Sequence, residues 1–204
     1  PVVYMFDKQG EAEWKVTADT GVLNTDDNVI LRDKVHLDGL LPTSFISTLD
    51  TPYLELDLVT QNVRSNQHVS IVGKEFQTEG VGLKGHLERK YFELLDQGHA
   101  IYFKIFAFQM LLCGTVSAKE SDFAEKVYVD AVRQVAEMQD NRITFSDDVI
   151  ITQGTIKIKA DKVVVIRSGD KGAEVMTAYG KPATFFQILD NGKPVNAHGN
   201  SIRY

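Results

Sequence analysis

Along most of the chain, apolar and polar residues alternate with a period of two. Because successive side chains of a β-strand point to opposite faces of a sheet, this alternation predicts strands with one buried and one exposed face. Turn-forming clusters such as Asp26-Asp27-Asn28 and Asp190-Asn191-Gly192 separate the alternating runs. Many short strands divided by frequent turns predict an all-β protein: a sandwich, a jelly roll or an open barrel. The clearest alternating runs are 14–18, 54–58, 69–71 and 156–160.

Segment 122–138 fits two structures. Phe123, Val127 and Ala131 recur at helical spacing, but Val127, Val129 and Ala131 also alternate with polar residues. Periodicity alone therefore leaves helix and strand open for this segment.

Segment 104–118, KIFAFQMLLCGTVSA, interrupts the alternation. A lysine, an apolar run and the small residues Val116-Ser117-Ala118 are typical of the end of a secretory signal peptide, yet the segment lies in the middle of the chain. Its apolar run is shorter than the ~18 residues that span a bilayer. The segment is therefore expected to join two parts of the protein.

Two pairs of segments resemble each other across this junction. WKVTADTGVL (14–23) resembles IKIKADKVVV (156–165), and NVILRDKVHLDG (28–39) resembles NRITFSDDVIITQG (141–154). The repetition predicts that both halves use the same strand–turn–strand unit. Such units usually stack into one continuous core.

Charge supports the same boundary. The 204 residues are 43% hydrophobic and 25% charged, as in a globular protein with room for one large or two small domains. The net charge of −6 argues against nucleic acid as a partner. Residues 1–103 hold 9 basic and 16 acidic residues, a net of −7, whereas residues 104–204 hold 13 and 12, a net of +1.

The sequence contains no recognisable catalytic or metal-binding motif. The five histidines lack metal-ligand spacing, and the pairs Asp26-Asp27 and Asp147-Asp148 are interpreted as solvated turn residues. Gly80 and Gly82 lack a following phosphate-binding helix and are expected to bend a strand. The single cysteine, Cys113, cannot form an intrachain disulfide. We therefore expect no enzyme, no cofactor and no metal site.

The remaining signal is the amount of apolar strand, as in Phe185-Phe186. By default such residues fill a core, but a slightly open sandwich would also offer a slot for acyl chains, whose burial contributes ~0.8 kcal/mol per CH2 without directional partners. A β-scaffold without a lipid cargo is the alternative. A carbohydrate-binding protein or hydrolase would need an exposed aromatic platform or clustered carboxylates, and Trp14, in an alternating strand, argues against it.

Longer runs resemble the lipopolysaccharide transport bridge proteins. VVYMFDKQGEAEWKVTAD (2–19) and LVTQNVRSNQHVSIVGKEFQTEGVGLKGHLERKYFEL (58–94) resemble the periplasmic domain of the LptC family. Residues 141–167 and 179–204, with TQGTIKIKADKVVV and YGKPATFFQ, resemble the N-terminal half of the LptA family. The expected organisation is an LptC-like unit (1–103), a signal-peptide-like seam (104–121) and a partial LptA-like unit (122–204).

The resemblance implies an OstA-like open β-jelly roll, a V-shaped antiparallel sandwich with lipopolysaccharide acyl chains in its apolar lumen. It implies stacking on other bridge proteins through edge strands, whose unpaired backbone groups template a further strand. It further implies a periplasmic protein that works with inner-membrane ABC transporter components. Its association with the inner membrane would use a membrane helix absent from this chain.

The resemblance and the alternation together nominate site residues. Phe185 matches a lumen phenylalanine, and Gly73 matches a glycine important for bridging, where a side chain would enter the groove or the edge. Val127 and Val129 match the first strand of the LptA-like unit, which favours strand over helix in 122–138 and predicts pairing with the end of the LptC-like unit. The expected lumen residues are Trp14, Phe76, Leu83, Phe145, Ile151, Ile158 and Phe185; those expected in bridge or edge pairing are Gly73, Val127 and Val129.

Overall fold

The computed structural model describes residues 1–42, 44–102, 120–168 and 173–203. The strands of these residues form one antiparallel sheet of 14 strands, which confirms the predicted all-β class. No helix in the described ranges is long and apolar enough to span a membrane. The signal-like segment 104–118, with Cys113, lies outside the described residues.

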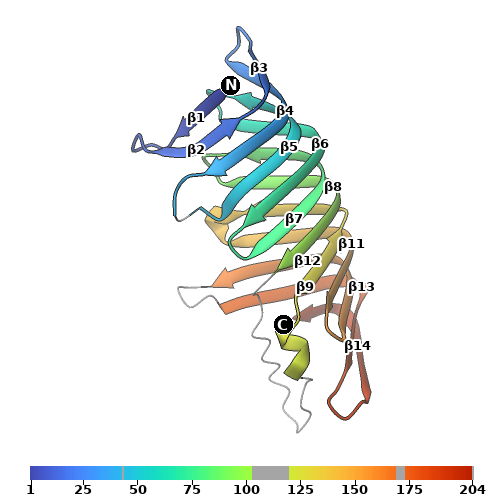
Figure 1. Ribbon diagram of the computed structural model, residues 1–204. Helices are drawn as coiled ribbons and strands as arrows, with labels where there is room; N and C mark the ends of the chain where they lie inside the picture. The colour runs from blue at the N-terminus through green and yellow to red at the C-terminus, as the bar shows by residue number, and fades with distance from the viewer. Residues whose placement is uncertain (43, 103–119, 169–172, 204) are drawn as a thin grey trace.

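The strands follow one another across the sheet almost in chain order (Figure 1). Only β3, which lies beside β4, and β9, which lies between β8 and β11, depart from the single path. The first half contains β1 Val2–Phe6, β2 Ala12–Thr17, β3 Thr20–Leu23, β4 Asn28–Gly39, β5 Ile46–Asp57, β6 Asn62–Gly73, β7 Phe76–His86 and β8 Tyr91–Tyr102. The second half contains the 3₁₀ turns η1 Glu120–Ala124 and η2 Met138–Asp140, and the strands β9 Val127–Ala131, β10 Arg133–Glu137, β11 Arg142–Gln153, β12 Ile156–Ser168, β13 Ala173–Ile188 and β14 Pro194–Arg203.

Most long strands are interrupted near their middle by a bulge. In β11 the register shifts between Ser146 and Val149, where Asp147 and Asp148 have positive φ of 65° and 54°. A bulge of this kind inserts one extra residue relative to the partner strand, which bends the bulged strand and increases its twist. The interpretation of Asp147-Asp148 as turn residues was therefore wrong: the pair is exposed but lies inside a strand. Similar register shifts occur in β4, β5, β6, β7, β12 and β13.

The bulges divide the sheet into two series of strand segments. β9 pairs with the C-terminal segment of β8 and β10 with its N-terminal segment, so that together they act as one bent strand. β2 and β3 divide β4 in the same way. The strand interpretation of 122–138 is thus confirmed for β9 and β10, whereas residues 122–124 belong to η1 and Met138 begins η2. The repeated Ala-Asp step lies at a bend in both halves, between β2 and β3 at Ala18-Asp19 and in β12 at Ala160-Asp161.

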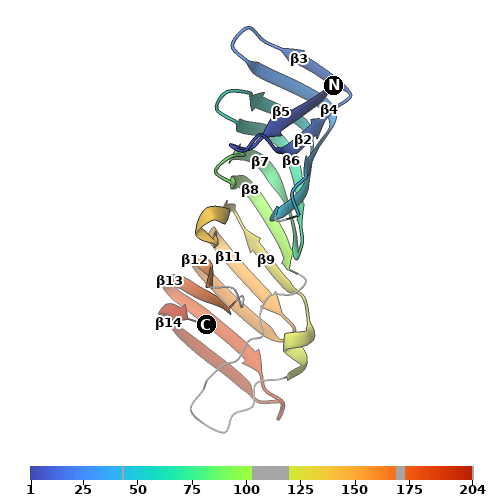
Figure 2. The same cartoon turned by 90° about the vertical axis from the view of Figure 1, so that its left-hand side faces the viewer.

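The inner face of the bent sheet carries the core. Buried residues of both halves form one hydrophobic cluster, and alternate residues of the same strands face outward. Gly80 lies at the register shift of β7, and Gly82 follows it with a positive φ of 80°, so both belong to an irregular strand as expected. Figure 2 shows the elongated result, with β1 near one end and β14 at the other.

Candidate functional site

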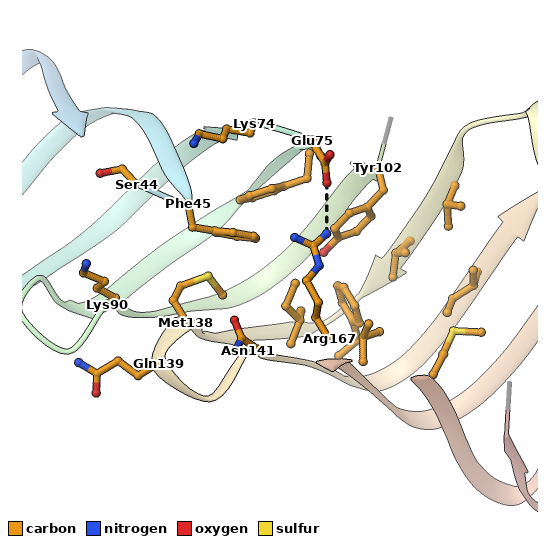
Figure 3. Close-up of a pocket in the computed structure, with 18 residues that line it drawn as sticks. Ser44, Phe45, Lys74, Glu75, Lys90, Tyr102, Met138, Gln139, Asn141 and Arg167 are labelled. Carbon is orange, nitrogen blue, oxygen red and sulfur yellow. Dashed lines mark hydrogen bonds and ion pairs between the residues drawn. The ribbon is translucent and has the colours of Figure 1, made fainter. Parts of the chain in front are cut away.

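An apolar cavity of about 550 Å3 lies where the two halves meet (Figure 3). The first half contributes Phe45, Phe76 and Tyr102, and the second half contributes Ile151 and Met176, among others. This volume is within the range of ordinary ligand pockets, about 300–1,000 Å3. Neither half forms the cavity alone, so its existence depends on the pairing of β8 with β9 and β10.

Four aromatic rings form a row along the cavity and cross the junction. Phe45 stacks on Phe76 with centroids 4.6 Å apart, and Phe76 stacks on Tyr102 at 5.9 Å. Tyr102 then meets Phe145 of β11 edge-to-face at 6.2 Å. A much smaller cavity, of about 30 Å3, shares Phe45, Phe76 and Tyr102 and extends the space toward Leu94. The wall is therefore apolar and aromatic from one half into the other.

The expected lumen residues are all buried, but only three of them line this cavity. Phe76, Phe145 and Ile151 are among its lining residues. The others lie in packed parts of the core. Trp14 packs on Phe92 with ring centroids 6.1 Å apart, and Ile158 and Phe185 are register partners in β12 and β13. The remaining one of the seven, Leu83, is buried in β7.

Val127 and Val129 lie at the junction itself. Their backbones are register partners of Tyr102 and Ala100 in β8. Both side chains are buried and line the cavity. One strand thus joins the halves and supplies part of the apolar wall.

Gly73 lies at the end of β6, an interior strand between β5 and β7 rather than a sheet edge. A Cβ atom built on Gly73 would overlap the ring of Phe76. The glycine therefore leaves space for the second ring of the aromatic row. This placement links Gly73 to the cavity rather than to an edge strand.

The mouth of the cavity is polar. Arg167 Nη2 of β12 donates to Glu75 Oε2, in the β6–β7 turn, at 3.1 Å, and Figure 3 shows the two side chains facing each other beside Tyr102. Lys74 donates to the carbonyl oxygen of Pro42, and Lys90 Nζ lies 2.9 Å from Glu13 Oε1. Sequence reasoning missed this rim, since no local motif joins residues 92 positions apart.

Polar contacts also connect the halves away from the mouth. Thr78 Oγ1 donates to Gln134 Oε1 at 2.8 Å in a buried site. At the surface, His99 Nδ1 lies 2.5 Å from Asp130 Oδ1 across the β8–β9 pair. Buried hydrogen bonds are directional, so the Thr78–Gln134 pair helps to fix the register of the junction. Within the described ranges, no group of three or more His, Cys, Asp or Glu side chains is placed to hold a metal ion.

Comparisons with known families divide the chain at the same junction. Residues 1–102 match the family described as lipopolysaccharide-assembly, LptC-related. Residues 128–204 match the LptA/(LptD N-terminal domain) LPS transport protein family.

Individual relatives follow this division. The lipopolysaccharide export system protein LptA of Escherichia coli K12 is 50% identical over 88 residues, which cover 43% of this chain and 48% of LptA. LptA of Haemophilus influenzae is 39% identical over 100 residues, 48% of this chain and 58% of that protein. The export system protein LptC of E. coli K12 is 32% identical over 102 residues, 50% of this chain and 53% of LptC. The chain therefore spans about half the length of the curated relatives it matches.

Among solved structures, the chain is similar to LptH of Pseudomonas aeruginosa, described as the LptA homologous periplasmic component of the lipopolysaccharide transport device. The TM-score is 0.42 at 8% sequence identity, over 91% of this chain and 93% of LptH.

Proposed function

Because the chain belongs to the LptC-related family over residues 1–102 and to the LptA/LptD N-terminal family over residues 128–204, we propose that it is a segment of a lipopolysaccharide transport bridge. The family resemblance seen in the sequence is thereby confirmed. These are assembly and transport families, so the chain is not an enzyme. In the proposed role, the apolar cavity at the junction holds acyl chains while they pass from the LptC-like to the LptA-like half.

The observation that carries this proposal is the aromatic row from Phe45 to Phe145, which crosses the junction inside a cavity built by both halves. An acyl chain gains its binding free energy from burial, about 0.8 kcal/mol per CH2, and needs no hydrogen-bond partner. The continuous row of aromatic rings therefore suits a cargo that slides. The polar mouth with Glu75 and Arg167 would keep a charged head group outside.

The partners follow from the same role. β1 and β14 each pair with one neighbouring strand in the sheet, and such edges are templates for strands of other bridge proteins. The proposed setting is the periplasm, where the bridge would receive lipopolysaccharide from inner-membrane ABC transporter components. The ATPase of this transporter, rather than this chain, would supply the energy for transport.

Photo-crosslinking tests the cargo. p-Benzoylphenylalanine replaces Phe145, an aromatic residue of the cavity wall, in one variant and the adjacent outward-facing Thr144 in the control. We expect a crosslink to lipopolysaccharide from position 145 and none from position 144. Equal crosslinking at both positions, or none at position 145 in a folded protein, would support the alternative of a β-scaffold without a lipid cargo.

A further inference from the structure

A second hollow, of about 450 Å3, lies on the outer side of the sheet at the same junction. Arg64 of β6, Lys84 of β7 and Arg89 of the β7–β8 turn line it from the first half. Glu137 of β10 and Asp140 of η2 line it from the second half. Arg64 and Lys84 are exposed while their neighbours along each strand are buried, so their side chains point away from the core.

The three cations each have an acidic neighbour but form no ion pair with it: Glu55 lies opposite Arg64, Glu93 opposite Lys84, and Glu88 beside Arg89. Arg64 and Lys84 are direct register partners, an arrangement of like charges that destabilises a sheet. None of Arg64, Lys84 and Arg89 forms an ion pair with another residue in the part of the chain that the structure describes. An acidic protein thus concentrates three unpaired positive charges in one concave surface.

Acidic neighbours in the same cross-strand row keep their charge but have other hydrogen-bond partners. Glu55, opposite Arg64, accepts a hydrogen bond from Tyr53 Oη at 2.5 Å. Glu93, opposite Lys84, accepts one from Tyr91 Oη at 3.1 Å, and its Oε1 lies 3.6 Å from Arg133 Nε.

The acids on the far side of the hollow are held by a single arginine. Arg142 Nε donates to Glu137 Oε2 at 2.7 Å, and Arg142 Nη2 lies 3.7 Å from Asp140 Oδ2. The hydrogen bond from Arg142 lowers the pKa of Glu137, as expected for a paired carboxylate. Arg142 thus offsets one of these two negative charges, so the acidic side of the hollow is engaged in ion pairs whereas its cationic side is not.

We propose that this hollow binds an anionic saccharide through its phosphate or carboxylate groups. Arginine presents paired N–H donors that match phosphate and carboxylate oxygens, and two cations on facing strands can contact one divalent group. His86 also lines the hollow, and its Nδ1 accepts from the backbone N–H of Arg89 at 3.3 Å. That bond leaves Nε2 as a donor and holds the turn that carries Arg89.

The position of the hollow favours the sugar part of a glycolipid. Gln139 lines both the hollow and the apolar cavity, so the two sites share one wall at the rim. Figure 3 shows the Gln139 side chain pointing away from the aromatic row. A molecule with acyl chains in the cavity could place its charged saccharide over this rim. The identification of the saccharide as part of lipopolysaccharide rests on the proposed function, whereas the cationic side of the hollow is an observation independent of it.

The test measures binding of two probes by calorimetry at physiological salt: the phosphorylated saccharide from fully deacylated lipopolysaccharide, and inorganic pyrophosphate. The variant is Arg64→Gln with Lys84→Gln. Its matched control is Lys157→Gln with Lys159→Gln, which removes the same charge from two exposed lysines of β12, outside the hollow. We expect saccharide binding to weaken by roughly tenfold or more in the hollow variant and by less than about twofold in the control, since a charge-assisted hydrogen bond is roughly twice as strong as a neutral one.

Thermal unfolding separates binding from folding. The double variant removes the repulsion between two facing like charges together with their pairings to Glu55 and Glu93, so Tm should stay nearly unchanged; a clearly lower Tm would assign Arg64 and Lys84 a structural role instead. Equal losses in both variants, no saccharide binding by the unmodified protein, or binding of pyrophosphate alone would each overturn the proposal. Lipid crosslinking at position 145 should persist in the hollow variant, so the two proposals can fail separately.

Discussion

At the scale of single residues, the space above Gly73 determines whether the aromatic row can form. The position has no unusual φ, so its need for glycine is steric: any Cβ atom would overlap the Phe76 ring. We predict that Gly73→Ala displaces Phe76 and lowers the free energy of unfolding by about 1–3 kcal/mol, the usual cost of overpacking a core. Denaturant unfolding with a fixed m-value measures this change.

The control is Gly199→Ala in β14, where a Cβ would make only ordinary contacts. It should change stability by less than about 0.5 kcal/mol. The double variant Gly73→Ala with Phe76→Leu should lose less stability than the sum of the two single variants, because the smaller side chain relieves the overlap. Simple additivity would show that Gly73 acts on something other than Phe76.

At the scale of elements, the bulge in β11 places two acidic residues in left-handed backbone conformation. Aspartate tolerates positive φ better than β-branched residues do. We predict that Asp147→Val lowers the free energy of unfolding by about 1–2 kcal/mol, whereas Asp147→Asn leaves it nearly unchanged. Lys157→Val, in a regular and exposed part of β12, is the control and should be neutral or stabilising. Equal effects of valine at positions 147 and 157 would contradict the backbone argument.

The bulges also show what the pattern of the chain could and could not predict. Alternation is a local property, so it correctly indicated strands such as β2, β5 and β12. It did not indicate that β11 continues through Asp147-Asp148, because an acidic pair is compatible with both a turn and a bulge. The repeat between 28–39 and 141–154 contained a signal for the bulge, because it aligns Asp147-Asp148 with Asp33-Lys34. In β4, Asp33 and Lys34 also both have positive φ.

For the site, alternation separated inward from outward residues but not packed from cavity-lining ones. Phe145 and Ile158 both face inward, and only the first lines the cavity. The difference depends on what lies opposite each side chain, and this is determined by pairing between β8 and the strands β9 and β10. The family resemblance predicted that the strand with Val127 and Val129 pairs with the end of the first half, but not the β8–β10 pair, and the Glu75–Arg167 contact at the mouth had no signal in the sequence.

At the scale of the whole molecule, hydrogen bonding across the junction resembles that within each half. β8 pairs over Gly98–Tyr102 with β9 and over Tyr91–Leu94 with β10, and one buried cluster continues through both halves. Neighbouring units of a stacked array contribute to stability through such interfaces. The two halves are therefore expected to unfold together although they match different families.

The single tryptophan allows this cooperativity to be measured. Trp14 lies in β2, so its fluorescence reports on the first half, whereas far-UV circular dichroism reports on all strands. We predict coincident denaturant transitions for the unmodified protein, as required for one cooperative unit. Val129→Asp should separate the transitions, because it buries a charge at a position only 3% exposed and weakens the β8–β9 pair without touching the core around Trp14.

The matched control is Tyr128→Asp, which introduces the same charge in the same strand at a side chain that is 48% exposed. It should keep the two transitions together, since an exposed carboxylate stays hydrated. Two separated transitions in the unmodified protein would show that the halves are independent domains, and the cavity between them would then open without global unfolding. A single transition in Val129→Asp would show instead that the rest of the junction, including β10 and the Thr78–Gln134 hydrogen bond, is sufficient to couple the halves.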